Sequence, residues 1–169
     1  MSHISYIIVN IDQQRLYCMD NDENIISDYP VSTSSFGVGN KNGSYQTPTG
    51  IHSIAQKIGD GCAINEVFVG RQSLGILSDL ITSKENLPDD IISSRILWLQ
   101  GEEPGLNKGN DKQGKLIDSY QRYIYIHGTS EEERIGKPAS HGCVRMKNKD
   151  VIELFDLVDE GCKVIINEK

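Results

Sequence analysis

Short runs in which apolar and polar residues alternate recur along most of the chain, which is the pattern of half-buried β-strands. Residues 4–11 (ISYIIVNI), 14–19 (QRLYCM) and 25–33 (IISDYPVST) form three such runs separated by turn-forming clusters. Further strands are expected at 51–55, 63–69, 94–99, 120–126 and 163–167. The short connections between the first strands predict antiparallel pairing, with one face of the sheet packed and the other exposed.

One segment after residue 147 has a helical period instead. Its apolar residues recur at the i, i+3, i+4 and i+7 positions of one helix face, namely Val151, Leu154, Phe155 and Val158. Asn148 is a suitable N-cap residue, and Gly161 marks the end of the helix. Residues 74–82 are a second, shorter candidate. The predicted fold class is therefore mainly β with one clear α-helix.

Long loops are the third feature of the pattern. Residues 34–50 are rich in Gly, Ser and Asn, while the stretches at about 56–93 and 101–119 carry weaker strand and helix signals. Loops of such length in a small domain are usually functional or disordered. No repeat, low-complexity tract or linker divides the sequence. We therefore expect residues 1–169 to form a single domain, with loop or lid regions at 56–93 and 101–119.

The composition suits one globular domain, since 37% of the 169 residues are hydrophobic. A net charge of −7 argues against the basic surface that a nucleic-acid-binding protein needs. The N-terminal apolar run at 6–9 is too short for a signal sequence or a membrane span. We expect a cytoplasmic protein without a membrane span, periplasmic only if a leader precedes this sequence. The scattered cysteines contain no C-x-x-C pair and are expected to be free thiols.

The candidate chemistry lies between the last predicted strands, in Ser140-His141-Gly142-Cys143-Val144-Arg145-Met146 and the upstream Ile126-His127-Gly128-Thr129. Cys143 is the candidate nucleophile, since a thiol next to a histidine can be activated for acyl transfer. Gly142 permits a tight turn that points successive N–H groups toward one spot. We expect the N–H groups of His141, Gly142 and Cys143 to form an oxyanion hole.

Two histidines compete for the role of base. His127 follows a predicted strand and can face the thiol across a loop, whereas His141 is too near Cys143 in sequence to aim easily at its sulfur. We favour His127, with the carbonyl of Gly128 or the hydroxyl of Ser140 as its orienting group.

The charged residues of this region receive two different interpretations. Arg145 carries a planar guanidinium group that can bind a substrate carboxylate through two hydrogen bonds. Its alternative role is a surface salt bridge. Glu131, Glu132 and Glu133 look like a solvated run of charge.

A metal site and a silent binding module are the rivals of a cysteine enzyme. His127, His141 and Cys143 could ligate zinc, but their spacing lacks the close pairs of zinc sites and no fourth ligand is evident. We therefore expect neither a metal nor another cofactor. A degenerate binding module is disfavoured because His127, Ser140, His141, Gly142 and Cys143 are all present.

The segment IHGTSEEERIGKPASHGCVRM resembles the signature of the L,D-transpeptidase catalytic domain, also called the YkuD domain. YPVST at 29–33 and TPTG at 47–50 also resemble segments of this family, so the similarity spans most of the chain. The resemblance implies a β-sandwich-like fold. It implies that Cys143 is the nucleophile, that His127 is the general base and acid, and that the turn at 141–143 is the oxyanion hole. Arg145 matches the Arg or Asn position of the family.

By the same resemblance, the substrate is a peptidoglycan stem tetrapeptide or muropeptide that ends in D-Ala. The thiolate attacks the L,D bond before D-Ala, and D-Ala leaves. An amine acceptor then gives a cross-link, whereas water gives carboxypeptidase action. Because no leader is visible, an L,D-carboxypeptidase that trims recycled or precursor stem peptides is a serious alternative. The family also implies acylation by carbapenems. The acceptor, the third-position diamino acid and the oligomeric state stay open.

Overall fold

Alternating apolar residues build a sheet that occupies most of the chain. The computed structural model describes residues 4–83 and 87–169. The strands are β1 (Tyr6–Asn10), β2 (Arg15–Met19), β3 (Ile25–Ser32), β4 (Gly50–Ile58), β5 (Glu66–Val69), β6 (Gln72–Ile76), β7 (Ile92–Gly101), β8 (Tyr125–Thr129), β9 (Val144–Met146) and β10 (Lys163–Asn167). The helices are α1 (Leu77–Thr82), the 3₁₀ turn η1 (Glu132–Arg134) and α2 (Asn148–Leu157).

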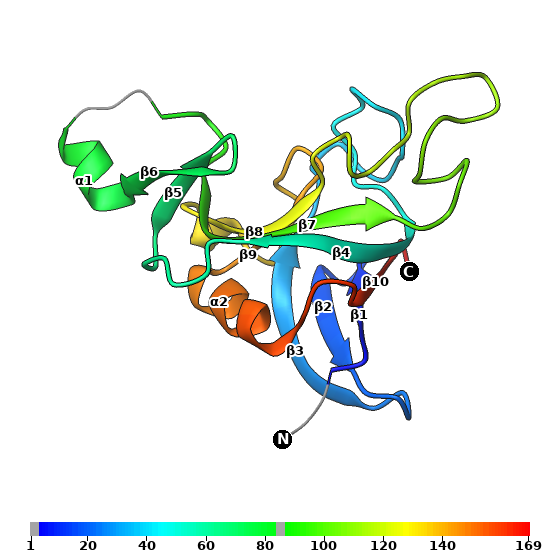
Figure 1. Ribbon diagram of the computed structural model, residues 1–169, viewed down its shortest axis with the longest axis horizontal. Helices are drawn as coiled ribbons and strands as arrows, with labels where there is room; N and C mark the ends of the chain where they lie inside the picture. Colours follow the sequence, from blue (N-terminus) through cyan, green and yellow to red (C-terminus); the bar gives the residue numbers. More distant parts are fainter. Residues whose placement is uncertain (1–3, 84–86) are drawn as a thin grey trace.

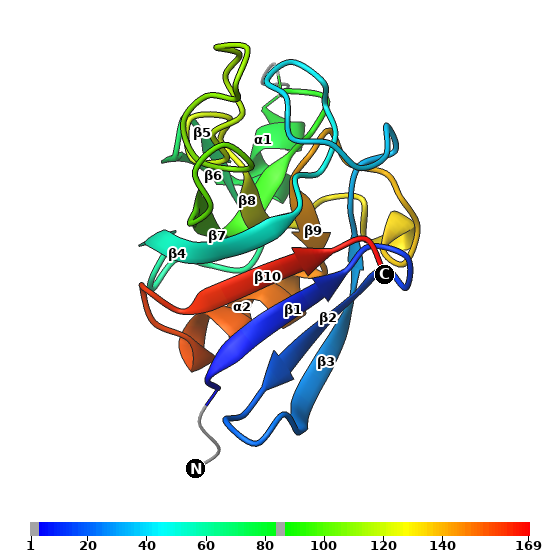
Figure 2. The same cartoon turned by 90° about the vertical axis from the view of Figure 1, so that its right-hand side faces the viewer.

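The strands follow the order β4-β10-β1-β2-β3-β9-β8-β7-β5-β6, and an additional pairing of β4 with β7 closes the first eight into a ring. Figure 2 shows β10, β1, β2 and β3 side by side as one layer, with β4 above β10. Figure 1 shows the second layer, where β4, β7, β8 and β9 lie above α2. Most pairings are antiparallel, but β1–β10 and β8–β9 are parallel. The fold is mostly β-sheet with a single helix of more than two turns in the described part of the chain.

The main core lies where α2 packs between these layers. Val151, Leu154 and Phe155 on α2 are almost fully buried against apolar residues from both layers, such as Leu16 and Ile126. Burying each such side chain stabilises the fold by about 1.5–3 kcal/mol. This face is the one predicted from the helical period, and its burial holds α2 in place after β9, the short strand that follows the cysteine turn.

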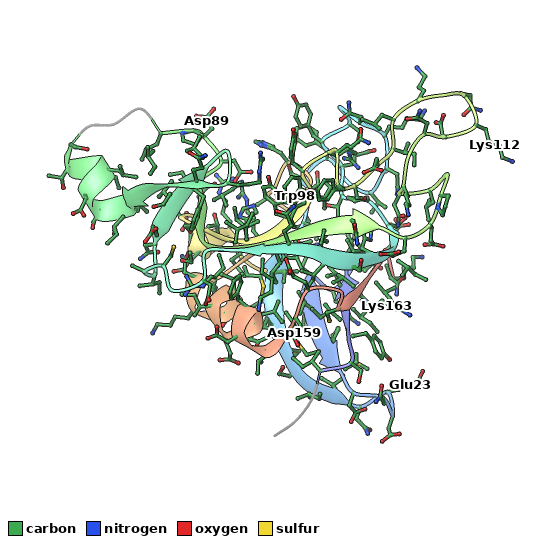
Figure 3. The ribbon with its side chains drawn as sticks, in the orientation of Figure 1. Glu23, Asp89, Trp98, Lys112, Asp159 and Lys163 are labelled. Carbon is green, nitrogen blue, oxygen red and sulfur yellow. The ribbon has the colours of Figure 1, made fainter. Side chains whose placement is uncertain are left out.

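The opposite side of β7 and β8 carries a second, aromatic cluster. Phe68, Ile96, Trp98 and Tyr125 are buried there, and Cys143 packs against them. Figure 3 shows Trp98 on the side of β7 away from α2. β7 is therefore covered on both faces, which explains its nearly continuous apolar sequence. This second face of the sheet is the one that bears the candidate catalytic residues.

Two segments differ from the expected elements close to the site. The predicted strand at 120–126 begins only at Tyr125, because residues 120–124 form a tight turn in which the Tyr123 N–H donates to the Tyr120 carbonyl. The strand β9 was not predicted, since three residues are too few to show an alternation. His127 consequently lies in the middle of β8 and not at a strand end.

The described part of the region at 56–93 contains regular secondary structure and is not simply a long loop. It holds β5, β6 and α1, which extend away from the rest of the sheet in Figure 1. The helix expected at 74–82 starts at Leu77 because residues 72–76 pair with β5 as a strand. Residues 102–119 hold only turns and isolated bridges.

Asn148 is the first residue of α2 and not its N-cap. The cap position belongs to Lys147, which makes no side-chain cap bond. The Asn148 side chain is instead buried, where it accepts hydrogen bonds from Ser93 Oγ and Ser94 Oγ, each at 2.6 Å, and donates to the Thr129 carbonyl. It thus ties the start of the helix to β7 and β8.

Candidate active site

The parallel strands β8 and β9 bring the predicted nucleophile and base to one face of the sheet. Ile126 on β8 is in register with Val144 on β9, and both point into the main core. Because side chains alternate along a strand, His127 and Arg145 point to the opposite face. Cys143 directly precedes β9 and packs on that same face. The loop between β8 and β9 therefore folds back and brings His127 and Cys143 to the same face, as expected.

His127 is fully buried, and only one of its ring nitrogens is engaged. Nδ1 lies 2.6 Å from the Gly128 carbonyl oxygen and donates to it, which assigns the proton to Nδ1. Nε2 has no hydrogen-bond partner among the described residues. Burial lowers the pKa of His127, and the negative charge of Asp90 opposes this shift. The imidazole is therefore neutral, with a free lone pair on Nε2.

Gly128 is required beside this histidine for steric reasons. A Cβ at position 128 would lie 2.4 Å from the Ser93 carbonyl oxygen and 2.5 Å from Asn148 Oδ1. Such contacts exclude any side chain, so β8 can approach β7 and the start of α2 only with glycine here. The His-Gly pair thus combines an orienting carbonyl with a close backbone contact.

The sulfur of Cys143 sits between two backbone groups of the residues that lead into β8. Sγ donates to the Tyr123 carbonyl and accepts from the Tyr125 N–H, both at 3.3 Å. Burial raises the pKa of the Cys143 thiol to about 12, while the Tyr125 N–H and the charges of Arg145 and Arg122 act in the opposite direction. The resting sulfur is therefore a thiol and not a thiolate.

Ser140 shapes the turn that carries Cys143. Its hydroxyl donates to the Cys143 carbonyl at 2.5 Å and accepts from the Gly142 N–H at 3.2 Å. Gly142 has φ +127°, a conformation that favours glycine. The N–H of Gly142 is thus engaged, whereas those of His141 and Cys143 donate no hydrogen bond to any described residue. Of the three expected oxyanion donors, these two are available.

The two upstream segments that resemble the family hold this turn from behind. Thr47, the first residue of TPTG, donates from its buried hydroxyl to the Gly142 carbonyl at 3.0 Å. Thr33, the last residue of YPVST, accepts the N–H groups of Ala139 and Ser140 on its carbonyl at 2.8 and 2.9 Å. Both segments are therefore structural supports of the cysteine turn.

Arg145 is buried in a double ion pair. Its side chain is 3% exposed, Nη2 lies 2.8 Å from Asp90 Oδ1, and Nη1 lies 3.2 Å from Glu131 Oε1. A guanidinium held by two carboxylates has little capacity left for a substrate carboxylate. The other carboxylate oxygen of Asp90 lies 3.9 Å from Nδ1 of His141, so Asp90 also faces the cysteine turn.

Glu131 and Glu132 have structural partners, contrary to the interpretation of residues 131–133 as a solvated run. Glu131 pairs with Arg145, and Glu132 accepts the backbone N–H of Asn148 at 2.7 Å. Glu132 therefore satisfies a free N–H at the start of α2, which is the function of a helix cap.

Cys143 opens onto a cavity of about 350 Å³. It is lined by Asn42, Gly43, Tyr45, Arg122, Tyr123, Ile124, His141 and Cys143. Tyr45 and Tyr123 both have φ near +58°, which is uncommon for tyrosine and is typical of backbone held in place at functional sites. The exposed ring of His141 contacts Phe36 and Tyr45 at the rim, with centroids 6.0 Å apart in each case. Larger hollows lie elsewhere but do not touch Cys143.

The described residues contain no group of three or more His, Cys, Asp or Glu side chains arranged to hold a metal. Nδ1 of His127 is occupied by a carbonyl, and His141 is turned toward the aromatic rim. In the same part of the chain, all four cysteines are free thiols. No described helix is long and apolar enough to cross a bilayer.

Several site residues escape sequence reasoning. Asp90 and Arg122 are charged residues in polar stretches, and nothing local distinguishes them from solvated neighbours. Trp98 stacks on Tyr120 with centroids 4.1 Å apart, beside the buried Tyr125. The alternation of aromatic residues at 120–126 is the one available signal for this cluster.

Comparison with known proteins places this arrangement in a family. The model of the YkuD family, the L,D-transpeptidase catalytic domain, matches residues 4–166. The probable L,D-transpeptidase YcfS of Escherichia coli is 26% identical over 95% of this chain and 43% of its own length. The putative L,D-transpeptidase YkuD of Bacillus subtilis is 57% identical over a shorter stretch, 36% of this chain and 37% of that protein. The chain thus spans less than half of these relatives.

Solved structures give the same assignment of the fold. A mutant L,D-transpeptidase of Enterococcus faecium superposes with a TM-score of 0.54 at 14% identity, covering 98% of this chain and 50% of that one. The L,D-transpeptidase of Xylanimonas cellulosilytica gives a TM-score of 0.52 at 17% identity, over 99% and 62%. Together with the family match over almost the whole sequence, these findings show that the chain belongs to the L,D-transpeptidase catalytic domain family.

Proposed function

We propose that this protein catalyses cysteine-dependent acyl transfer on peptidoglycan stem tetrapeptides, with a thioester at Cys143 and release of D-Ala. One observation carries the proposal: the buried His127 has its Nδ1 bound to the Gly128 carbonyl and its Nε2 free, on the sheet face that bears Cys143. This is the tautomer that a general base needs.

In the first step, Nε2 of His127 takes the thiol proton while Sγ attacks the carbonyl carbon between the diamino acid and D-Ala. Both groups are neutral at rest because burial raises the pKa of the thiol and lowers the pKa of the imidazole. The proton therefore moves as the sulfur–carbon bond forms. Sγ has no hydrogen bond to His127 among those of the described residues, and such contacts commonly tighten when substrate binds.

The carbonyl oxygen gains negative charge during this attack. The free N–H groups of His141 and Cys143 are its expected donors, and Ser140 keeps the turn in shape by engaging the Gly142 N–H. The imidazolium of His127 then returns the proton to the departing amine of D-Ala. The thioester remains on Cys143 until an amine or water attacks its carbonyl.

The test is incubation with a stem tetrapeptide, with and without an excess of a second D-amino acid, followed by mass spectrometry of the products. Transpeptidase action exchanges D-Ala for the added amino acid, whereas the L,D-carboxypeptidase alternative gives only the tripeptide. Cys143→Ala is the matched control and should give neither product. If the protein with Cys143 intact yields neither product, the proposal fails in both forms. A silent binding module would retain peptide binding without either product.

A further inference from the structure

The cavity at Cys143 contains a positive charge without an acidic partner. Among the described residues that line it, Arg122 is the one with a permanent charge. Its Nη2 donates to the Gln46 carbonyl at 2.7 Å, with longer contacts to Ser44 Oγ at 3.5 Å and from Nη1 to the Gly39 carbonyl at 3.4 Å. All three acceptors are uncharged.

This situation is unusual in an acidic chain. Glu and Asp outnumber Lys and Arg by 24 to 17, yet Arg122 forms no ion pair with any described carboxylate. Partly buried charges normally have a charged or well-bonded partner. Burial lowers the pKa of the Arg122 guanidinium, as expected for a cation with incomplete compensation. The charge also acts on the thiol, since Arg122 opposes the rise in the pKa of Cys143.

Arg145 offers the contrast. It is almost fully buried and is already paired with Asp90 and Glu131, so its fork is used inside the protein. Arg122, on the turn that precedes β8, is half-buried and lines the open cavity. The guanidinium that can meet an incoming anion beside the nucleophile is therefore that of Arg122.

We propose that Arg122 binds the C-terminal carboxylate of the donor peptide, the carboxylate of the residue that leaves. The inference rests on the function proposed above. When the scissile carbonyl lies on Sγ, the carboxylate of the next residue follows within one residue length, about 3.8 Å between successive Cα atoms. Cys143 and Arg122 line one cavity, so a carboxylate that enters this cavity from the scissile bond meets the guanidinium. A planar fork matches a carboxylate through two parallel hydrogen bonds.

This contact restricts the enzyme to cleavage before the C-terminal residue of the donor peptide. A donor that ends directly after the scissile bond places its carboxylate at Arg122, whereas a donor extended by one residue places a neutral amide there. Arg122 is therefore the residue that recognises the free chain end of the tetrapeptide donor proposed above.

The experiment measures binding and turnover separately. Calorimetry on the Cys143→Ala background compares the tetrapeptide acid with its C-terminal carboxamide, and release of the terminal residue by the Cys143-containing proteins gives kcat/KM for the same pair. With Arg122 present, we expect the acid to be preferred on the order of 10- to 100-fold. Arg122→Gln should reduce the acid-to-amide ratio to near one, chiefly by lowering the affinity for the tetrapeptide acid. Arg122→Lys should restore part of it.

Arg15→Gln is the charge-matched control. Arg15 lies on β2, where it pairs with Asp28, and its loss changes the net charge equally. This variant should keep the full preference for the acid. A loss of affinity for acid and amide alike in Arg122→Gln would overturn the proposal and assign Arg122 to support of residues 39–46. Absence of any preference with Arg122 present would also overturn it. Preferential binding of the acid without any turnover would support carboxylate binding by Arg122 but refute the proposed reaction.

Discussion

Asp90 is the acidic residue whose removal tests the electrostatics of the site most sharply. It reaches the site from the segment before β7, where one carboxylate oxygen pairs with Arg145 at 2.8 Å and the other faces His141 at 3.9 Å. Figure 3 labels its neighbour Asp89 on this segment. Asp90→Asn keeps the size of the side chain and removes the charge.

The cost in stability follows from how deeply the pair is buried. Surface pairs contribute about 0–1 kcal/mol, while breaking a buried pair costs about 3–5 kcal/mol. Asp90 is 24% exposed, Arg145 is 3% exposed, and Glu131 remains as a second partner at 3.2 Å. We therefore expect Asp90→Asn to lose about 1–3 kcal/mol of unfolding free energy. For a domain of this size, that lowers Tm by about 3–9 °C.

The effect on catalysis has a definite sign. The carboxylate of Asp90 favours the imidazolium and so raises the pKa of His127 against the larger opposing effect of burial. Removing this charge lowers the pKa of His127 further. The acid limb of the kcat/KM profile, which reports the base in the free enzyme, should therefore move to lower pH.

The assay is release of the terminal amino acid across the pH range, with thermal unfolding measured in parallel. Glu131→Gln is the matched control, because Glu131 also pairs with Arg145 but is not among the groups that shift the pKa of His127. It should cost about 1 kcal/mol or less and leave the acid limb in place. An equal shift in both variants, or a shift of Asp90→Asn to higher pH, would refute this reasoning.

Two further changes probe the turn and a buried histidine. Gly142→Ala introduces a Cβ 3.3 Å from the Gln46 carbonyl at φ +127°, and should lower kcat on the order of 100-fold by displacing the turn. Gly37→Ala is the control, because Gly37 also has a positive φ, +90°, but has open space around its Cβ. It should cost a similar amount of stability, about 1–2 kcal/mol, without the loss in kcat. Equal activity of the two variants would contradict the idea that Gly142→Ala displaces the turn. Burial lowers the pKa of His52 from 6.5 to about 4. As the pH drops from 6.5 to 4, the unfolded chain therefore takes up a proton that the folded protein does not. The free energy of unfolding should fall over this range, by about 3 kcal/mol at most. His52→Gln should flatten this slope in denaturant titrations at several pH values, and an unchanged slope would contradict the assignment to His52.

The fold was predictable where local patterns decide it. The strands β1, β2, β3 and β10 and the apolar face of α2 lie where alternation or helical period places them, because these elements bury one face against the core. The pattern failed at 120–124, where Tyr120 stacks on Trp98 and Tyr123 lies tilted beside it in a turn. Tertiary packing outweighed strand propensity there.

The site was predictable in its residue types more than in its contacts. Cys143 and His127 lie on one face as expected, and the Gly128 carbonyl orients the imidazole as suggested. Arg145 has a fork suited to carboxylates, but its partners come from this protein, and Asp90 lies 55 residues away in sequence. No local pattern reveals a contact over such a separation. The same applies to Arg122, whose partners lie on the loop that precedes β4.

The most direct test of the account is the mass of the intact protein during turnover of a tetrapeptide donor. We predict an adduct equal to the donor minus its terminal D-Ala, located by peptide mapping on Cys143, absent in Cys143→Ala and strongly reduced in His127→Gln. Release of D-Ala by Cys143→Ala, or an adduct confined to another of the four cysteines, would contradict the assignment of Cys143 as the nucleophile.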